Sequence, residues 1–405
     1  MSDLILSKPK SLLEQAAAAG STRAMVRLGQ MQVGSPEGGV KRNDAAGFAM
    51  FKKAVDAGSP RGMMYLASCY KHGDGTAVDP AKAEALYSKA VTTAEAAIKT
   101  GKDDEALVTL GIAFDQGRGV KSDYAKAMDY FKKAADLGNR EAWRRMGAMY
   151  RFGDGTPKDY NKALECYKKA FDMGDAAADF ESAEMFLHWD FAGHADYAKN
   201  YLVQAGLWGY CPAMSEAGYL FMKGAGSGPK PEVPKNYTNA MRWFTEGSNL
   251  GDAACMNGLG LMIGSGFAGP VDQEKATAWY KASAEGGCDS GMYNLASVFE
   301  DKKDYAQALV WYRKAAEKDY PAARASLGMF YEHGTGVPRD YSQAMKWYLE
   351  AAADHDSSAM AGVGRLYAEG NGVPKDMKLA GQWMTKAADA GDPDAKKWIA
   401  EHGMK

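Results

Sequence analysis

Hydrophobic residues recur along the chain with the period of an α-helix, and short glycine-containing segments interrupt them. In the stretch EALVTLGIAF, which starts at Glu105, the residues Ala106, Leu110, Gly111 and Phe114 fall at positions i, i+4, i+5 and i+8. These positions lie on one face of an α-helix, so that face is expected to be buried. The pattern therefore predicts amphipathic helices.

This helical pattern is repeated along nearly the whole chain. A Leu-Gly-like pair, followed by an aromatic residue three positions after its small member, occurs in ten copies spaced 32 to 44 residues apart, with a partial eleventh copy at Ala400. A period of this length indicates a repeat array, for which chain length says little about the number of domains. The small residues of the ten copies are Gly29, Ala67, Gly111, Gly147, Ala183, Gly218, Gly260, Ala296, Gly328 and Gly364.

Each copy contains the signals for two helices joined by a glycine loop. A Gly-x-Gly segment such as Gly117/Gly119 follows the first helix, and a left-handed glycine there ends the helix. Four residues later stands an aspartate whose carboxylate can accept the free N–H groups of a second helix. An aromatic pair and Lys-Ala-Ala then follow, so small residues allow close helix approach while aromatics fill the gap. The predicted capping residues are Asp79, Asp123, Asp159, Asp272, Asp304, Asp340 and Asp376.

Four copies depart from this pattern of residues. Copy 2 continues its second helix through VTTAEAAIKT, and copy 6 carries the insertion KGAGSGPKPEVPKNY. Copy 8 passes from Phe299 to Asp304 without a Gly-x-Gly loop. Copy 5 is the most degenerate, because bulky residues replace its glycine loop and His194 stands in the aspartate position. We expect the array to bend differently at copy 5.

The repeated pattern A-x-x-x-L-G-x-x-Y-x-x-G-x-G-V-x-x-D-x-x-K-A-x-x-W-Y-x-K-A-A-x-x-G resembles the Sel-one-like repeat, a relative of the tetratricopeptide repeat. The resemblance implies an all-α fold: a right-handed superhelical α-solenoid of about ten antiparallel helix pairs, used in protein assembly and signalling. We expect an N-terminal capping helix at 1–20, the repeat array at 21–392 and a C-terminal capping helix at 393–405.

Composition and charge restrict the partner class. The chain is 46% hydrophobic and 25% charged, and its 49 basic and 51 acidic residues give a net charge of −2. No strong field would attract nucleic acid or an anionic membrane, so neither is expected as a partner. No segment approaches about 18 apolar residues, and the N-terminus lacks a secretory pattern, which predicts a cytoplasmic protein. The five cysteines are scattered without Cys-x-x-Cys pairs and are expected to be free thiols.

Candidate catalytic motifs lack their structural context. GLGLMIG at Gly258 resembles a phosphate-binding loop but lies in a predicted helix with no preceding strand. Ser-x-x-Lys occurs at Ser7/Lys10 and Ser227/Lys230 without the companion motifs of penicillin-binding enzymes. The six histidines form no His-x-x-x-His pair. We therefore predict no enzymatic activity, no cofactor and no metal ion.

The resemblance to tetratricopeptide-like solenoids implies that the first helix of each pair lines the concave face. If this phase applies, copies 4 to 6 present a mixture of arginine, aromatic and methionine residues that is typical of protein interfaces. The alternative is that Phe180 and Tyr219 are additional core residues of two irregular copies. The predicted partner-binding residues are Arg144, Arg151, Phe180, Glu184, Leu187, Tyr219, Met222 and Tyr293.

These observations favour a non-catalytic repeat scaffold that binds a protein or peptide as an adaptor or regulator. Bacterial proteins with this type of repeat also suggest an alternative, an immunity or inhibitor protein that neutralises a cognate effector toxin. In either case we expect a monomer with a protein ligand, and the sequence does not identify that ligand.

Overall fold

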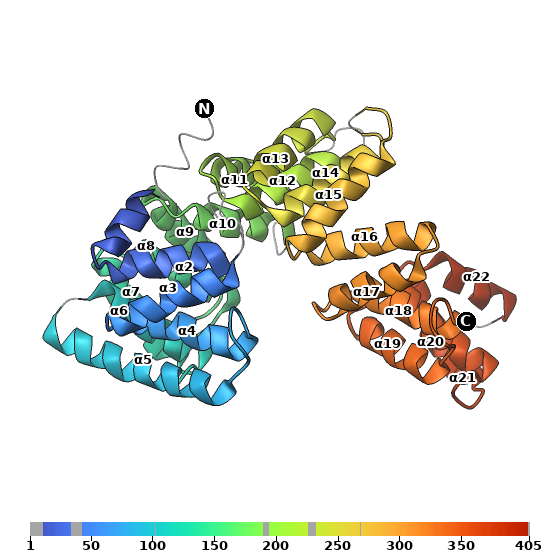
Figure 1. Cartoon of the computed structure of the whole chain (residues 1–405), viewed down its shortest axis with the longest axis horizontal. Helices are drawn as coiled ribbons and strands as arrows, with labels where there is room; N and C mark the ends of the chain where they lie inside the picture. Colours follow the sequence, from blue (N-terminus) through green and yellow to red (C-terminus); the bar gives the residue numbers. More distant parts are fainter. Residues whose placement is uncertain are drawn as a thin grey trace. The chain divides into compact units, whose positions relative to one another are not determined.

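The structure is a computed structural model that describes residues 11–33, 43–101, 103–188, 194–225, 232–267 and 269–403. Within these residues the chain is helical almost throughout and forms no β-strand, although an isolated antiparallel bridge joins Ala225 and Val233 (Figure 1). The prediction of an all-α fold is therefore confirmed. Residues 11–18 are helical, and the boundaries expected for the two capping helices stay a prediction.

The described helices form ten consecutive pairs, here called repeats 1 to 10, followed by α22 (Pro393–Glu401). The first helices of the pairs are α2 (Thr22–Val33), α4 (Pro60–His72), α6 (Asp104–Gln116), α8 (Arg140–Phe152), α10 (Ala176–His188), α12 (Cys211–Lys223), α14 (Ala253–Gly264), α16 (Asp289–Asp301), α18 (Pro321–His333) and α20 (Ser357–Glu369). The second helices are α3 (Asp44–Asp56), α5 (Pro80–Thr100), α7 (Tyr124–Asp136), α9 (Tyr160–Asp172), α11 (Ala195–Leu207), α13 (Tyr237–Asn249), α15 (Gln273–Glu285), α17 (Tyr305–Ala316), α19 (Tyr341–Ala353) and α21 (Met377–Asp389).

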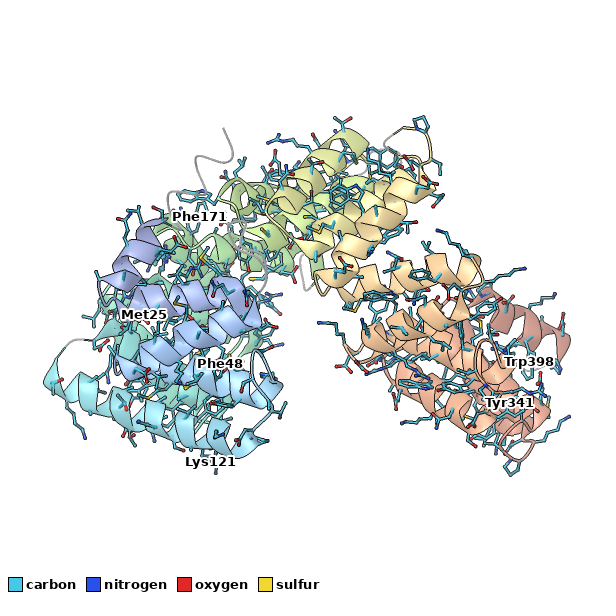
Figure 2. The ribbon with its side chains drawn as sticks, in the orientation of Figure 1. Met25, Phe48, Lys121, Phe171, Tyr341 and Trp398 are labelled. Atoms are coloured by element: carbon cyan, nitrogen blue, oxygen red, sulfur yellow. The ribbon has the colours of Figure 1, made fainter. Side chains whose placement is uncertain are left out.

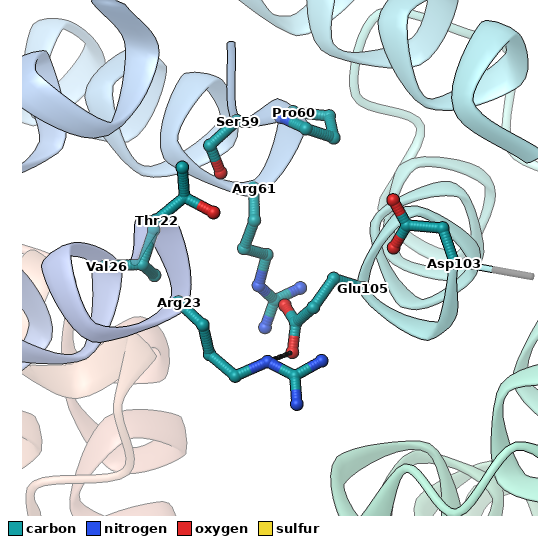
Figure 3. Close-up of a pocket in the computed structure, with 8 residues that line it drawn as sticks. All are labelled: Thr22, Arg23, Val26, Ser59, Pro60, Arg61, Asp103 and Glu105. Atoms are coloured by element: carbon teal, nitrogen blue, oxygen red, sulfur yellow. Dashed lines mark ion pairs between the residues drawn. The ribbon is translucent and has the colours of Figure 1, made fainter. Parts of the chain in front are cut away.

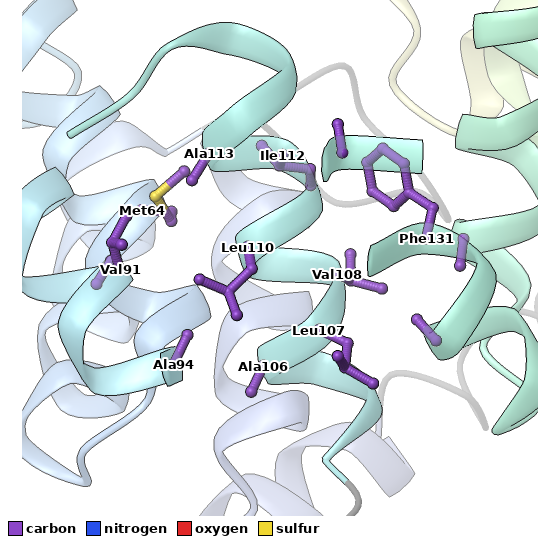
Figure 4. Close-up of a cluster of buried hydrophobic side chains, with 14 of the residues drawn as sticks. Met64, Val91, Ala94, Ala106, Leu107, Val108, Leu110, Ile112, Ala113 and Phe131 are labelled. Carbon is purple, nitrogen blue, oxygen red and sulfur yellow. The ribbon is translucent and has the colours of Figure 1, made fainter. Parts of the chain in front are cut away.

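The chain divides into two compact parts, an N-terminal part, Met1–Cys255, and a C-terminal part, Met256–Lys405. In both parts the core lies between successive helices and is built from alanine, leucine, methionine and aromatic side chains. Around Leu110 of α6, for example, side chains from α4 through α7 are buried together (Figure 4). Each repeat therefore buries its apolar face against its neighbours, which is how solenoids acquire stability.

The small residue of the Leu-Gly pair has the predicted role of allowing helix contact. A Cβ atom added at Gly111 would lie 2.4 Å from the Phe131 ring, and one added at Gly147 would lie 2.6 Å from the Tyr167 ring. In each case the first helix of a pair approaches an aromatic residue of the second helix so closely that a side chain would overlap it.

The glycine loops and the capping aspartates are also confirmed. Gly117 ends α6 with φ 64°, and its N–H group donates to the Ala113 carbonyl. The Asp123 carboxylate accepts a hydrogen bond of 3.0 Å from the Lys126 backbone N–H at the start of α7. All seven predicted aspartates cap a second helix in this way: Asp79, Asp123, Asp159, Asp272, Asp304, Asp340 and Asp376.

The irregular copies have local structural consequences. The extension of copy 2 lengthens α5 to 21 residues, as predicted. His194 precedes α11 without a side-chain capping hydrogen bond. In copy 8, which lacks the Gly-x-Gly loop, Lys303 takes the left-handed conformation with φ 60°. Part of the copy 6 insertion and both Ser-x-x-Lys motifs lie outside the described residues.

All five cysteines are free thiols, which confirms the expectation from their spacing. Of the helices that the structure describes, none combines the length and the apolar character needed to cross a membrane.

Candidate functional site

Seven of the eight predicted binding residues lie on three consecutive first helices of the N-terminal part, α8, α10 and α12. We call this surface the first-helix face of repeats 4 to 6. Tyr293 lies on α16 in the C-terminal part, where its ring packs against Tyr312 and Tyr320 at centroid distances of 5.6 and 5.3 Å. The seven residues are Arg144, Arg151, Phe180, Glu184, Leu187, Tyr219 and Met222.

The two arginines of α8 are held by carboxylates at the start of α10. The Arg144 Nε atom lies 3.0 Å from Asp175 Oδ2, and its Nη1 atom lies 3.9 Å from Glu181 Oε1. Arg151 is buried and its Nη1 atom lies 3.3 Å from Glu181 Oε2. Glu181 therefore bridges both arginines, so this network joins repeat 4 to repeat 5 and fixes the orientation of both guanidinium groups.

The electrostatics of this network favour the charged form of Arg144. Burial alone would lower the pKa of the Arg144 guanidinium, but the carboxylates of Asp175 and Glu141 raise it above its ordinary value. A buried charge is tolerated only when it is paired in this way. The sequence predicted the arginines but missed their acidic partners, because it gives no direct measure of which side chains on adjacent repeats meet.

The aromatic residues of the face are half-buried and have aromatic neighbours. The ring of Phe180 lies 5.5 Å from that of Tyr210, and Tyr219 makes an edge contact of 5.0 Å with Phe244. The Tyr219 hydroxyl donates to the Ala254 carbonyl at 3.5 Å. Each ring thus contributes to packing and also presents part of its surface to solvent. Glu184, Leu187 and Met222 are likewise half-buried on the same face.

A second charged network lies at the N-terminal ends of the first helices of repeats 1 to 4. The Arg61 Nη2 atom of α4 contacts both carboxylate oxygens of Glu141 in α8, at 2.6 and 2.7 Å. Arg61 is 4% exposed. Burial would raise the pKa of Glu141, but Arg61 and Arg145 hold it well below its ordinary value. This pair spans two repeats, because α6 lies between α4 and α8 in the chain.

Arg23 of α2 makes a parallel contact with α6. Its Nη2 atom lies 2.9 Å from Asp104 Oδ2, and its Nε atom lies 3.0 Å from Glu105 Oε1. Arg23, Arg61 and Glu105 surround a cavity of about 240 Å³, with the Ser59 side chain on its wall (Figure 3). Burial raises the pKa of Glu105, and the two arginines oppose that shift. The cavity offers both hydrogen-bond donors and acceptors, and its charges largely neutralise one another.

Asp179 is a further unusual residue, which the sequence reasoning missed. It lies in the first turn of α10, at the fourth helical position, and is 4% exposed. Burial, together with the Asp172 carboxylate, raises the pKa of Asp179 to about 7. A comparison of the repeats reveals Asp179. Of the residues at the fourth position of the ten first helices, only Asp179 and Arg324 are charged. The others are Met25, Met63, Leu107, Trp143, Met214, Met256, Met292 and Met360.

Within the described ranges, histidine, cysteine, aspartate and glutamate side chains form no group of three or more that could hold a metal ion. The repeated aspartates cap helices, and the arginine–carboxylate networks connect repeats.

Comparison with known proteins identifies the repeats. The family model of the Sel1 repeat matches nine segments: 22–59, 60–92, 104–139, 141–175, 211–252, 253–288, 289–320, 321–356 and 357–392. The degenerate copy 5, at 176–210, is not among the matched segments. The matches cover well over half of the chain.

Two curated relatives share part of this sequence. The chain is similar to the chitin synthase regulator SKT5 of Saccharomyces cerevisiae, at 25% identity over 83% of this chain and 44% of the yeast protein. It is also similar to the Sel1-repeat-containing protein YjcO of Escherichia coli, at 29% identity over 35% of this chain and 60% of that protein. The chain therefore spans less than two thirds of the length of these relatives.

A solved structure extends the similarity to the fold. A protective antigen present in uropathogenic Escherichia coli strains, which displays an SLR fold, is 26% identical with a TM-score of 0.51. The alignment covers 98% of this chain and 84% of that chain.

Proposed function

The chain belongs to the Sel1 repeat family, and from this premise we propose that it is a non-catalytic scaffold that binds a protein or peptide partner as an adaptor or regulator. We propose that the partner occupies the first-helix face of repeats 4 to 6 and that the chain binds it as a monomer. Sel1 repeats are scaffolds that typically mediate protein–protein interactions, so the partner class follows from the family, whereas the surface is our own assignment.

The observation that supports this surface is the network of Arg144 and Arg151 with Glu181. Ordering a long side chain on binding costs free energy, and these two arginines are already ordered by the carboxylates of α10. Glu181 itself is 30% exposed, so an incoming polar group can still reach the network. Rigid polar groups beside aromatic rings are a suitable composition for specific recognition of a protein segment.

The aromatic and aliphatic side chains beside the network support the same surface. Phe180 and Tyr219 each retain exposed ring surface while their packing against Tyr210 and Phe244 limits their motion. Half-buried aromatic residues are frequent anchors of interfaces because they contribute area at a low cost in conformational entropy. The face thus combines polar orientation with apolar contact.

The similarity to the yeast chitin synthase regulator supports a regulatory role. The name of that relative describes a regulator of an enzyme, although the similarity covers 44% of its length. We propose that this chain likewise acts by binding its partner, and we do not transfer the yeast target.

The proposal is tested by affinity capture with the full chain, identification of partners by mass spectrometry, and calorimetry with the purified partner. Tyr219→Ala and Leu187→Ala should each weaken binding by about 1–3 kcal/mol. Leu349→Ala is the matched control, because Leu349 is also a large exposed apolar residue but lies on α19. Loss of binding in the control with normal binding of both other variants would contradict the proposed surface.

The same experiment separates an adaptor from an immunity or inhibitor protein. If the partner is an enzyme, its activity is measured with increasing amounts of the chain. Inhibition that Tyr219→Ala relieves would assign the inhibitor role, whereas unchanged activity would assign the adaptor role.

A further inference from the structure

The cavity of Figure 3 lies where the first helices of repeats 1 to 3 begin. Thr22 of α2, Arg61 of α4 and Asp103, the N-cap of α6, contribute to its lining. In Figure 2 it lies beside α2, the helix that carries the labelled Met25. Its volume of about 240 Å³ is below the roughly 300–1,000 Å³ of sites for drug-sized ligands, so it suits a small molecule.

Two buried side chains bring hydrogen-bond donors to the cavity. Arg61 is 4% exposed, and its Nη2 atom contacts Glu141 and Tyr65, but among the described residues no hydrogen bond engages its Nε or Nη1 atom. Ser59 is 6% exposed. Its Oγ atom accepts from the Gly62 N–H group at 3.0 Å, while its own hydroxyl proton has no acceptor in the part of the chain that the structure describes. Water or a ligand in the cavity therefore has to accept from these groups.

The start of α6 supplies carboxylates instead. The Asp103 Oδ1 atom accepts from the Ala106 N–H group at 3.0 Å, and no hydrogen bond from a described residue reaches its Oδ2 atom. Figure 3 shows Asp103 across the cavity from Thr22. Glu105 also lines the cavity, and its Oε1 atom lies 3.0 Å from Arg23 Nε. The cavity therefore has donors on its α4 side and acceptors on its α6 side.

The charges of the lining restrict the class of ligand. Two cations, Arg23 and Arg61, stand against two anions, Asp103 and Glu105. A ligand with a single charge would be attracted by one pair and repelled by the other. A small zwitterion matches both pairs, because its carboxylate can face the donors while its ammonium group faces the acceptors. A peptide terminus carries only one of these two charges.

The charged groups behind the lining add no bare charge to the cavity. Glu141 lies within ion-pair distance of both Arg61 and Arg145. Asp104 pairs with Arg23 at 2.9 Å. The polarity of the cavity is therefore determined by the residues that line it.

We propose that this cavity binds a free α-amino acid, with its carboxylate toward Ser59 and Arg61 and its ammonium group toward Asp103. Val26 and Pro60 complete the lining and contact a small aliphatic side chain of the ligand. The cavity lies on repeats 1 to 3, apart from the first-helix face of repeats 4 to 6, so each of the two binding proposals can fail without the other.

The experiment compares three compounds of similar shape by isothermal titration calorimetry with the full chain. L-Valine carries both charges, isovalerate lacks the ammonium group, and isobutylamine lacks the carboxylate. We expect L-valine to bind at least roughly tenfold more tightly than either of the others, because each of them loses a charge-assisted hydrogen bond. Glycine and L-alanine are titrated in parallel to measure the contribution of the aliphatic side chain.

Two variants connect this binding to the cavity and preserve the helix caps. Asp103→Asn keeps a good N-cap but removes the anion, so it should weaken binding of L-valine at least roughly tenfold and leave isovalerate unaffected. Ser59→Asp keeps the cap of α4 and places an anion among the donors, so it should weaken L-valine similarly and strengthen isobutylamine. Asp123→Asn, at the N-cap of α7, is the matched control and should change none of these affinities. Circular dichroism and thermal unfolding verify that each variant is folded.

Three results would overturn the inference. The first is that none of the three amino acids binds. The second is that isovalerate or isobutylamine binds as tightly as L-valine, which would remove the argument for a zwitterion. The third is an unchanged affinity for L-valine in folded Asp103→Asn, which would place the amino acid elsewhere on the chain.

Discussion

The second helical position of each first helix distinguishes two regions of this molecule. In repeats 1 to 4 it is charged, and from repeat 5 onward it is small or neutral. The charged residues are Arg23, Arg61, Glu105 and Glu141, and the later residues are Ala177, Pro212, Ala254, Ser290, Ala322 and Ser358.

The charges in the first region connect repeats that are not neighbours in sequence. Arg23 reaches Glu105 two repeats later, and Arg61 reaches Glu141 in the same way. In the C-terminal part, by contrast, Arg365 of α20 pairs with Glu332 of the adjacent first helix α18 at 3.1 Å. Solenoid stability is usually described by nearest-neighbour contacts alone. Repeats 1 to 4 also have ion pairs between repeats that are two apart, so we expect them to unfold more cooperatively than the later repeats.

The largest expected effect comes from Arg61→Ala. Removing the buried arginine leaves the half-buried Glu141 without its main partner, so the free energy of unfolding of the N-terminal part should fall by about 3 kcal/mol. Arg324→Ala is the matched change in the C-terminal part and should cost about 1 kcal/mol, because its partners Asp319 and Asp354 are exposed. Urea unfolding measures both. Equal costs would refute the distinction between the two regions.

A second effect concerns Asp179 and depends on pH. Because the folded pKa of about 7 exceeds the ordinary value of 3.8, the folded state binds more protons between these values. Stability should therefore fall as pH rises from about 4 to 7, and level off above that range. Asp179→Asn should stabilise the chain by on the order of 4 kcal/mol at pH 8 and by less, on the order of 1–2 kcal/mol, at pH 5.

Thermal unfolding of both chains at these two pH values checks the prediction. Asp175→Asn is not a suitable control because Asp175 is ion-paired with Arg144. Asp136→Asn is suitable, since Asp136 is exposed, and it should show no comparable dependence on pH. An equal gain in stability for Asp179→Asn at both pH values would show that ionisation is not the cause.

A smaller effect compares two glycines in the same position of the repeat. In Gly147→Ala the added Cβ would lie 2.6 Å from the buried Tyr167 ring, which should cost about 1–3 kcal/mol. In Gly364→Ala it would lie 3.0 Å from the flexible Met384 side chain. That strain is partly offset by the helix propensity of alanine, about 0.5–1 kcal/mol. Urea unfolding measures both variants. Equal shifts of the two unfolding midpoints would show that the cost does not depend on whether the opposing side chain is Tyr167 or Met384.

The smallest effect concerns the caps of the second helices. Asp123→Ala removes the acceptor of the Lys126 N–H group and should cost about 0.5–2 kcal/mol, with most of the stability retained in Asp123→Ser. His194→Asp should raise the stability of the chain, because α11 begins without a side-chain capping hydrogen bond. Chemical denaturation of the three variants measures these changes, and a loss of stability in His194→Asp would contradict the capping argument.

The local structure was predictable because each signal has a local physical cause. Three such signals are the period of the apolar residues, the left-handed Gly117 and the Asp123 cap. Each acts within a few residues of the chain, so each was predicted correctly from the sequence. The family resemblance added the pairing of helices. The close approach at Gly147 also followed, because a small residue opposite an aromatic recurs in most repeats, although Met384 takes the place of the aromatic at Gly364.

The candidate sites were less predictable, because they depend on the rotation from one repeat to the next. That rotation decides whether Arg61 contacts the next first helix, the one after it, or neither. Single residues do not encode the rotation. The same reason hides the carboxylate partners of Arg144. Asp179 is different, since a comparison of equivalent positions across the repeats would have identified it as an acid in a position otherwise held mostly by methionine.

The free thiols differ in accessibility, so one of them can be labelled selectively with a dye. Cys69, Cys166, Cys211 and Cys255 are buried, and burial raises the pKa of the Cys69 and Cys166 thiols to about 12 and about 11. Cys288, at the start of α16, is partly exposed. A thiol-reactive dye should therefore label the native chain at Cys288 first. Ligand binding and unfolding can then be followed from a single reporter in the C-terminal part without introducing a cysteine.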